Sequence, residues 1–361
     1  MSDPRPAAVI TGISGNLGLR LLEQLSGFDV TGVDMHPPST DLPLRFEPVD
    51  LGHEPACAQM VDILRDARAT AVVHLAFVID PVRTGVLDRD RMWQINVAGT
   101  ARVLEAIAEY NRNGGAVRKF IYPSSVSIYG PDLPPLVSEA HPHQAHTLPY
   151  AVHKKEVESV IAARLPSIGP CSTYILRAHI FTGATVQNYL VGALRGTPTG
   201  KGRLAQRLRA RGSRLPILLP FGQRYLDNNF QFVHVDDMAR LLAYLLRRAP
   251  VPPESVVLNV AGRGPVISMR RAIELAHASV LRLPGKASVR RVLQLMWDWG
   301  ISGVPPEALP YFTGSYTMDT RRLRAFLGSD YESIIQHTNE SAFADSFAAP
   351  SSAPQKMPQS A

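Results

Sequence analysis

The sequence predicts an α/β protein with a doubly wound parallel sheet and a smaller C-terminal lobe. Two observations lead to this class. Short β-branched runs alternate with helical segments over the first 178 residues, and the first run leads into a glycine-rich turn that opens a helix. This alternation is typical of parallel strands joined by helices that cover both faces of a sheet. The chain of 361 residues is long enough to bury such a core.

The expected elements follow one another in the order that this sheet requires. The first strand is AAVITG, the helix NLGLRLLEQL follows its glycine turn, and the next two strands are DVTGVD and RFEPVD. A helix near residues 55–67 precedes the strand AVVHLAF, and the long helix DRMWQINVAGTARVLEAIAEY precedes the strand KFIYPSS. The helix YAVHKKEVESVIAARL and the strand STYILRA complete the core.

The alternation weakens after Ala178, and this sets the expected domain boundary. Residues 1–178 are assigned to the core, to which a strand–helix pair near residues 229–248 is expected to return. Residues 179–335 are assigned mainly to the substrate lobe. Residues 340–361 are small, polar and rich in proline, so they are expected to be disordered.

The composition indicates a globular protein of a reducing compartment. The two cysteines, Cys57 and Cys171, give neither a disulfide framework nor a cluster of metal ligands. The start MSDPRPAAVITG lacks the features of a signal peptide, and no apolar run approaches the ~18 residues of a membrane span. We therefore expect a cytoplasmic protein without a bound metal.

The net charge of +7 is concentrated in one segment. No acidic residue lies between Glu158 and Asp227, an interval that holds ten lysines and arginines. A solvated face explains such a run most simply. The alternative is a surface for an anionic partner, and residues 195–214 suggest a short amphipathic helix that touches a membrane surface weakly. No aromatic residues for base stacking are interleaved there, so nucleic-acid binding is not expected.

The glycines of TGISGNLG are explained by a bound pyrophosphate. A glycine turn that opens a helix directs several backbone N–H groups at one point, and the helix dipole adds partial positive charge there. Gly12 permits the tight turn, Gly15 lets a phosphate approach, and Gly18 lets the helix pack on the strand. Asp34 ends the next strand, where a carboxylate binds the adenosine ribose and repels a 2′-phosphate. The pattern predicts a Rossmann-type fold that binds NAD rather than NADP.

The run YAVHK suggests an acid/base pair. Tyr150 and Lys154 lie four residues apart on the expected helix, so both side chains fall on one face. A phenol titrates at about 10, and a neighbouring ammonium is expected to lower that pKa. Ser125, at the end of an expected strand, would hold a substrate oxygen beside the tyrosine; Ser124 is the alternative if the register differs by one residue. Taken alone, the motif is also explained by a tyrosine and a lysine on a surface helix.

Together these segments resemble the extended short-chain dehydrogenase/reductase family, also called the NAD-dependent epimerase/dehydratases. The matching motifs follow in family order across residues 7–240: TGISGNLG, Asp34, VDL, VVHLAF, NVAGT, YPSSVSIYG, YAVHK, ILRAHIFTG and FQFVHVDDMA. The resemblance implies an enzyme in which Tyr150 is the acid/base. It further implies that Lys154 holds the nicotinamide ribose and that Ser125 hydrogen-bonds the reacting oxygen.

The resemblance also implies which residues contact the cofactor. These are the glycine loop with Asn16 and Leu17 for the pyrophosphate, Asp34 for the adenosine ribose, Asp50 and Leu51 for the adenine, Leu75 and Ala76 for the channel wall, Asn96 as a brace beside the nicotinamide, and Tyr150 with Lys154. Phe77 stands where the family more often has a second alanine. His179 is expected near the nicotinamide amide, or else is a packed histidine at a strand end.

Departures from the family pattern bear on the substrate. Members that act on nucleotide-sugars usually carry an asparagine where Ile180 stands, and an arginine for the diphosphate where Phe230 stands. Losing one charge-assisted contact costs on the order of 1.5–3 kcal/mol, so these changes favour a fairly apolar substrate. Asn188 keeps a position that often touches the substrate, and Arg224 or the 195–214 cluster offers another cation for a diphosphate.

Three functions therefore stay open. The main hypothesis is an NAD-dependent dehydrogenase or reductase that transfers hydride between the nicotinamide and a secondary alcohol or ketone on a fairly apolar small molecule. The alternative is a nucleotide-sugar epimerase or dehydratase that retains its NAD, and the third is a non-catalytic dinucleotide-sensing protein. By analogy with the fold, the long helix and the Tyr150 helix also suggest a homodimer.

Overall fold

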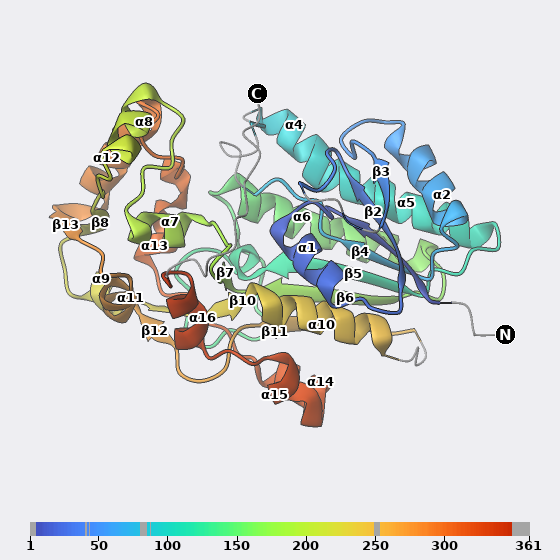
Figure 1. The fold of residues 1–361 in the computed structure, drawn as a ribbon. Coiled ribbons are helices and arrows are strands. Elements are labelled where there is room, and N and C mark those ends of the chain that lie inside the picture. The colour runs from blue at the N-terminus through green and yellow to red at the C-terminus, as the bar shows by residue number, and fades with distance from the viewer. Residues whose placement is uncertain are drawn as a thin grey trace.

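The structure is a computed structural model, and it describes residues 5–39, 42, 44–79, 85–86, 88–248 and 253–348. Its centre is a sheet of seven parallel strands in the order β11-β6-β5-β4-β1-β2-β3 (Figure 1). The strands are β1 (Ala7–Thr11), β2 (Asp29–Asp34), β3 (Arg45–Pro48), β4 (Ala71–His74), β5 (Lys119–Ser125), β6 (Ser172–Ala178) and β11 (Ser255–Val260). The expected doubly wound, Rossmann-type sheet is confirmed.

Strand β1 shows why its run of apolar residues forms the middle of this sheet. Successive side chains of a strand point to opposite faces. Ala8 and Ile10 pack into one apolar core, while Val9 packs into another on the opposite face. A strand that is buried on both sides needs apolar residues at every position, and this is the pattern that AAVIT provides.

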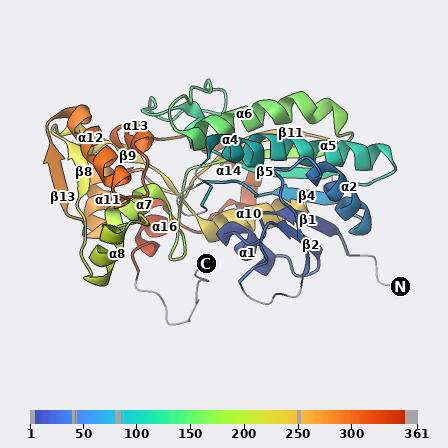
Figure 2. The same ribbon diagram turned by 90° about the horizontal axis from the view of Figure 1, so that it is seen from above.

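Helices cover both faces of the sheet (Figure 2). One face carries α1 (Asn16–Glu23), α10 (Val235–Arg247), α14 (Arg321–Leu327) and α15 (Tyr331–Ile334), and the other carries α2 (Ala56–Asp66), α5 (Gly99–Arg112) and α6 (Pro149–Arg164). Helices α5 and α6 pack against each other. A homodimer built on these two helices stays a prediction.

The C-terminal lobe lies to one side of the sheet and has an apolar core of its own (Figure 1). Its strands pair as β7 (Ile180–Thr182) with β10 (Phe232–His234), β8 (Ile217–Pro220) with β13 (Val280–Leu283), and β9 (Asn229–Phe230) with β12 (Ile267–Ser268). Its helices include α7 (Tyr189–Arg195), α8 (Arg203–Ala210), α9 (Arg224–Asp227), α11 (Met269–Ala276), α12 (Gly285–Asp298), α13 (Leu309–Thr313) and α16 (Asn339–Asp345).

The domain boundaries differ from the sequence prediction in two places. Strand β11 lies beyond residue 248 yet pairs with β6 as an edge strand of the central sheet. Disorder was expected from residue 340, but α16 is folded and Phe343 is fully buried, with its ring centroid 4.6 Å from that of Phe232. The small and polar residues of the tail dominate its composition, so the packing of Phe343 and of its neighbour Phe347 could not be predicted from composition. The expected disorder of residues 349–361 falls outside the described residues.

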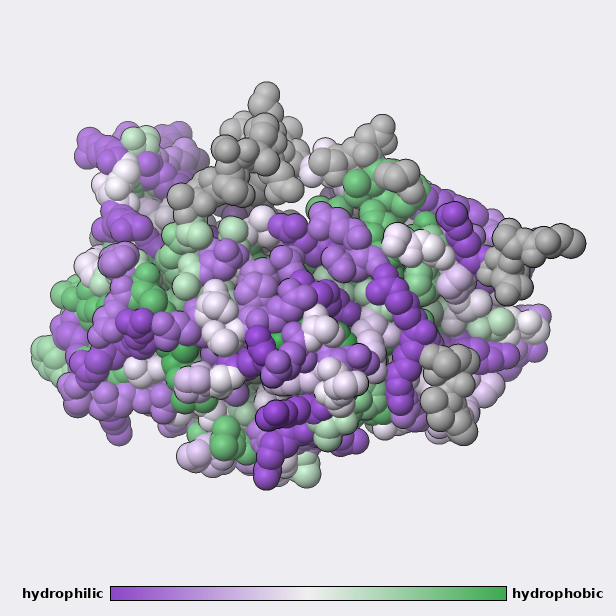
Figure 3. Space-filling model, turned by 60° about the horizontal axis from the view of Figure 1, so that its bottom comes forward, coloured by the Kyte–Doolittle hydropathy of each residue, from purple (hydrophilic) through white to green (hydrophobic). Residues whose placement is uncertain are grey.

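The basic segment, residues 195–214, is the part of the chain where membrane contact is expected. Within the described part of the chain, no helix is both long and apolar enough to cross a bilayer. In the basic segment, α8 buries Ala205 and leaves Leu204 exposed. Figure 3 shows a face on which hydrophobic residues form small areas separated by hydrophilic ones. Weak membrane contact through residues 195–214 stays a prediction.

Candidate active site

The glycine loop lies where the strand order of the sheet reverses. Strand β1 pairs with β2 on one side and with β4 on the other, which is the switch point where doubly wound sheets bind ligands. A Cβ on Gly12 would lie 2.5 Å from the backbone nitrogen of Ala76, and one on Gly18 would lie 2.5 Å from the carbonyl oxygen of Ile13. Gly12 also has a φ of +73°. The chain is packed so closely here that glycine is required.

The N-terminus of α1 fits an anionic ligand. Gly15 is its N-cap and supplies no side-chain cap to the first-turn N–H groups. Backbone N–H groups of this kind, together with the helix dipole, bind phosphates. The side chain of Asn16 is engaged elsewhere, since its Nδ2 donates to the carbonyl oxygen and to the hydroxyl of Thr185, both at 2.9 Å. Asn16 thus ties the loop to the C-terminal lobe, while Leu17 packs against the core below.

Asp34 is held beside the glycine loop at the end of β2. One carboxylate oxygen accepts the N–H of Ser14 at 3.1 Å and the other accepts the N–H of Met35 at 2.8 Å. The carboxylate is therefore fixed in the position expected for a ribose partner. The Asp50 side chain differs, because it forms an ion pair with Arg91.

The segment after β4 forms the other side of the switch point. The N–H groups of Leu75 and Ala76 donate to the carbonyl oxygen and the hydroxyl of Thr11, at 3.0 Å and 3.3 Å. Leu51, expected near the adenine, is buried, and its carbonyl oxygen accepts a hydrogen bond from Arg102 at 3.0 Å. Leu75 and Ala76, the channel residues predicted from the sequence, therefore lie against Gly12, and the glycine loop, Asp34 and this segment together fit a dinucleotide.

Ser125 and Tyr150 meet at the end of β5. The hydroxyl of Tyr150, in the first turn of α6, lies close enough to Ser125 for that side chain to lower its pKa. Ser124 points elsewhere, because its hydroxyl donates to the carboxylate of Glu158 at 2.5 Å. Between the two serines left open by the sequence, Ser125 is the one beside Tyr150.

The expected effect of Lys154 on Tyr150 is not found. Burial raises the pKa of Tyr150 to about 12, and the nearby side chain of Ser125 offsets this only partly. The Nζ of Lys154 donates to the carbonyl oxygen of Pro123 at 2.7 Å and lies 6.0 Å from the Tyr150 ring centroid. Burial lowers the pKa of Lys154 to about 7. A spacing of four residues put both side chains on one face, but a carbonyl oxygen draws the ammonium away from the phenol.

Asn96 binds the backbone of the segment that follows β4, and its expected place beside the nicotinamide stays a prediction. It lies in a π-helical turn, Gln94–Ala98, that interrupts the long helix between α4 (Arg89–Trp93) and α5. Its Oδ1 accepts the N–H of Val78 at 2.7 Å and its Nδ2 donates to the carbonyl oxygen of Val78 at 3.1 Å. The extra residue of a π turn often occurs at functional sites. Here the turn directs the amide at the chain that follows β4.

His179 is packed by its own chain. Its Nε2 lies 2.7 Å from the carbonyl oxygen of Tyr316, and its Nδ1 accepts the N–H of Ile180 at 2.8 Å. Burial lowers the pKa of His179 to about 3, so the ring is neutral. Of the two explanations given by the sequence, the packed histidine agrees with these contacts.

The predicted substrate residues are used largely by the fold. Asn188 caps α7, since its Oδ1 accepts the N–H of Val191 at 2.9 Å and its Nδ2 donates to the carbonyl oxygen of Phe181 at 2.6 Å. Phe230 is fully buried in the core of the C-terminal lobe. Ile180 is partly buried in β7. Phe230 therefore does not face a substrate, contrary to the sequence prediction.

Two tyrosines of the C-terminal lobe join the site without having been predicted. Tyr311 donates to the carbonyl oxygen of Ser127 at 3.3 Å, and its ring packs edge-on against Tyr316 with centroids 5.7 Å apart. Burial raises the pKa of both phenols, and the nearby Tyr150 adds to the effect. Both lie in the run LPYFTGSYTM, which has no motif, so only the folded chain brings them to Tyr150.

Hydroxyl groups gather around Tyr150 as a result. The hydroxyl of Ser127 donates to that of Ser125 at 3.0 Å. The Tyr316 hydroxyl lies near Ser127 and the Thr147 hydroxyl near Tyr311, but among the described residues neither buried oxygen has a partner in good hydrogen-bond geometry. We refer to Ser127, Thr147, Tyr311 and Tyr316 as the hydroxyl cluster.

Comparison with known proteins decides the family. The model of the NAD dependent epimerase/dehydratase family matches residues 8–261. The chain belongs to this family. Its NAD-dependent members are enzymes, as the sequence resemblance implied. This assignment covers the glycine loop, Asp34, Ser125, Tyr150 and Lys154.

Several solved structures have a fold similar to that of this epimerase/dehydratase-family protein. The UDP-glucose 4-epimerase of Thermus thermophilus, solved with NAD, has 20% identity and a TM-score of 0.63 over 94% of this chain and 98% of its own. The Bacillus cereus UDP-glucuronic acid 4-epimerase, solved with UDP-glucuronic acid and NAD, has 18% identity, a TM-score of 0.63 and the same coverage. The Campylobacter jejuni UDP-Glc/GlcNAc 4-epimerase has 21% identity and a TM-score of 0.63 over 95% and 98%. At these identities the likeness shows the fold.

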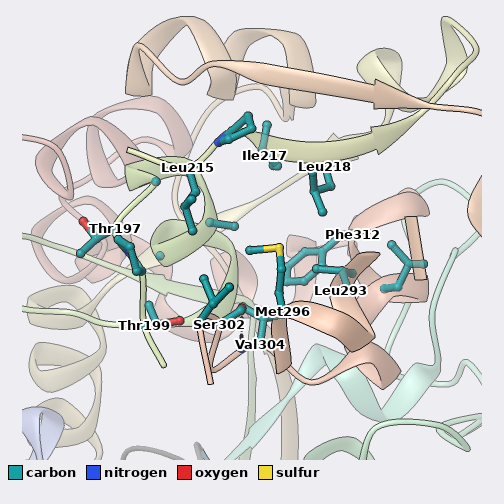
Figure 4. A pocket seen from close by; sticks show the side chains of 17 residues that line it. Thr197, Thr199, Leu215, Ile217, Leu218, Leu293, Met296, Ser302, Val304 and Phe312 are labelled. Atoms are coloured by element: carbon teal, nitrogen blue, oxygen red, sulfur yellow. Dashed lines mark hydrogen bonds between the residues drawn. The ribbon is translucent and has the colours of Figure 1, made fainter. Parts of the chain in front are cut away.

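The C-terminal lobe of this epimerase/dehydratase-family protein holds a pocket (Figure 4), and Ser125, Tyr150 and Lys154 are not among the residues that line it. Most of the side chains that line it are apolar, and they come from α7, β8, α12 and α13 and from the loops beside these elements. Leu309 and Phe312 of α13 line the pocket, whereas Tyr311 of the same helix contacts Ser127. No predicted site residue lines it.

Proposed function

We propose that this protein is a nucleotide-sugar epimerase or dehydratase that keeps its NAD through the reaction. The observation that carries the proposal is that Ser125 and Tyr150 lie together at the end of β5, with Lys154 one turn along α6, at the same edge of the parallel sheet as the glycine loop after β1. Membership of the NAD-dependent epimerase/dehydratase family supports this choice, as do the structurally similar UDP-glucose and UDP-glucuronic acid 4-epimerases.

The residues support an oxidation at a carbinol carbon that is later reversed. When bound, NAD would supply a reversible acceptor for the hydride. Ser125 would hold the substrate hydroxyl, and Tyr150 would take the hydroxyl proton as the C–H bond breaks, then give it back when the bond re-forms. Tyr150 is protonated at neutral pH. Its use as a base therefore requires positive charge nearby, for which Lys154 is the candidate.

The hydroxyl cluster supports a polyhydroxylated substrate. A buried hydroxyl without a partner costs on the order of 1–3 kcal/mol, and the hydroxyls of Tyr316 and Thr147 are in this condition among the described residues. Sugar hydroxyls would satisfy them. The case for an apolar substrate rested partly on Phe230, which is buried away from the site. The dehydrogenase acting on an apolar alcohol is therefore the less supported hypothesis.

Retained cofactor and net turnover separate the hypotheses. We expect mass spectrometry of the denatured, purified protein to detect NAD, and a panel of UDP-sugars to include one that is isomerised or dehydrated without net NADH formation. Net NADH formation with sterol or acyl alcohols, without isomerisation or dehydration of any UDP-sugar, would establish the dehydrogenase instead. Bound NAD without turnover of any class would favour the dinucleotide-sensing protein.

A further inference from the structure

The ring of Phe77 touches both catalytic side chains. Its centroid lies 3.8 Å from the Nζ of Lys154 and 5.7 Å from the ring centroid of Tyr150, at an interplanar angle of 86°. A cation over the face of an aromatic ring within about 6 Å is attracted by the ring quadrupole. The contact with Lys154 is well inside this range, and Lys154 is only 5% exposed.

The backbone holds Phe77 in this place from both sides. The preceding residue, Ala76, donates its N–H to Thr11 and lies against Gly12. The following residue, Val78, is bound through its N–H and its carbonyl oxygen by Asn96. Because the residue before Phe77 and the residue after it are both hydrogen-bonded, the backbone holds the ring of Phe77 against Lys154.

We propose that Phe77 is a positioning residue whose ring keeps the buried Lys154 side chain in its ammonium form and next to Tyr150. The inference rests on the proposed function, in which Lys154 must be charged. Smaller side chains at this position offer no ring to the ammonium. With the alanine that is usual in the family, Lys154 would contact only the carbonyl oxygen of Pro123 and the ring of Tyr122 among the described residues.

The other groups around Lys154 do not replace Phe77. Glu158 favours the ammonium, but its carboxylate is already paired with Arg177 at 2.7 Å. His74 on β4 is neutral, because burial lowers its pKa to about 3, and the lysine charge adds to this. On the remaining sides lie the phenol of Tyr150 on α6 and the ring of Tyr122 on β5, the latter 4.4 Å from Nζ.

Fluorination of the ring tests the proposal without changing the packing. Phenylalanines with one, two and three ring fluorines, placed at position 77, weaken the quadrupole stepwise at nearly constant size. The readout is the titration of Lys154 in the cofactor-free protein, followed by NMR of lysine labelled at Cε and assigned with Lys154→Arg. We expect the pKa to fall with each fluorine, by about one unit in total.

Two substitutions bracket the series. Phe77→Leu removes the ring at similar volume and is expected to lower the pKa as far as the most fluorinated ring does, whereas Phe77→Trp is expected to preserve or raise it. An unchanged pKa across the fluorinated proteins would overturn the proposal and leave the role to Tyr122. Because this titration needs no substrate, it separates failure of the Phe77 proposal from failure of the proposed function.

Kinetics supply the second readout once a substrate is known. The basic limb of the kcat/KM profile is expected to move to lower pH in Phe77→Leu by the amount that the Lys154 pKa falls, since this profile reports the free enzyme. A uniform loss of activity at every pH would indicate a merely structural role and contradict the proposal.

Discussion

Lys154 donates its hydrogen bond to the carbonyl oxygen of Pro123, at 2.7 Å, and not to the phenol of Tyr150 on the same face of α6. The phenol lies beside Ser125 instead. The acid and the cation expected to activate it are therefore adjacent but not hydrogen-bonded to each other. In the proposed reaction the charge of Lys154 would have to act on the phenol through space.

The titration of Lys154 predicts a pH-dependent stability. Its pKa is lowered by burial to about 7 in the folded protein, from an ordinary value of about 10.4. Between these values the unfolded chain binds more protons, so the free energy of unfolding rises with pH in this window. We expect wild type to gain stability relative to Lys154→Met from about pH 7 to 10, measured by denaturant unfolding. Parallel curves for the two proteins would show that the lysine is not buried.

Two buried histidines predict a second pH-dependent loss of stability, on the acid side. Burial lowers the pKa of His74 and of His179 to about 3. Because the unfolded chain binds protons from about pH 6.5 downward, stability is lost as the pH falls through this range toward 3. We expect His179→Gln to lose less stability than wild type between about pH 6 and pH 4. The exposed His53 serves as the control, and His53→Gln should follow the wild-type curve.

Crowding at Gly12 predicts loss of the cofactor. An added Cβ would lie 2.5 Å from backbone and would sit at a φ of +73°, so Gly12→Ala must displace the loop. We expect the purified variant to retain no NAD while wild type retains it. Gly192→Ala is the matched control, since its Cβ would meet only ordinary contact at 3.6 Å inside α7. Equal NAD content in all three proteins would mean that the loop does not hold the pyrophosphate.

Removing one phenol oxygen of the hydroxyl cluster should act on stability and on substrate binding in opposite directions. Tyr316→Phe deletes a buried hydroxyl that lacks a partner among the described residues, so the free energy of unfolding is expected to rise by about 1 kcal/mol. The same change removes a proposed sugar contact and should raise KM about tenfold or more. Thermal unfolding and steady-state kinetics measure the two effects. A stabilised variant with unchanged KM would exclude Tyr316 from the substrate site.

Much of the sheet was predictable because its strands are short, apolar and bounded by turns. The segments KFIYPSS and STYILRA match β5 (Lys119–Ser125) and β6 (Ser172–Ala178) to the residue. Strand β11 was missed because it follows the return helix α10 and lies next to β6, about 80 residues earlier in the chain. Alternation along the sequence does not encode that pairing.

The candidate site was predictable where one motif fixes one position, and not where contacts join distant segments. Asp34 lies beside the glycine loop, and Ser125 lies beside Tyr150, as spacing and motif order implied. The direction of the Lys154 ammonium depends on Pro123 and Phe77, and Tyr316 arrives from a segment far beyond Tyr150 in the chain. Helical spacing predicts that two side chains share a face, but it does not predict which atom a long side chain such as Lys154 will hydrogen-bond.

The central claim is that Tyr150 exchanges a proton while hydride moves reversibly between a nucleotide-sugar and retained NAD. Rapid mixing of the NAD-loaded protein with UDP-sugars, followed by absorbance of the reduced nicotinamide, tests it most directly. We expect a transient reduced cofactor that decays as product forms, and at least about a hundredfold slower appearance in Tyr150→Phe with the same NAD content. Tyr110→Phe, a change on α5, should behave as wild type. Product formation at the wild-type rate in Tyr150→Phe, or no reduced cofactor with any UDP-sugar, would contradict the account.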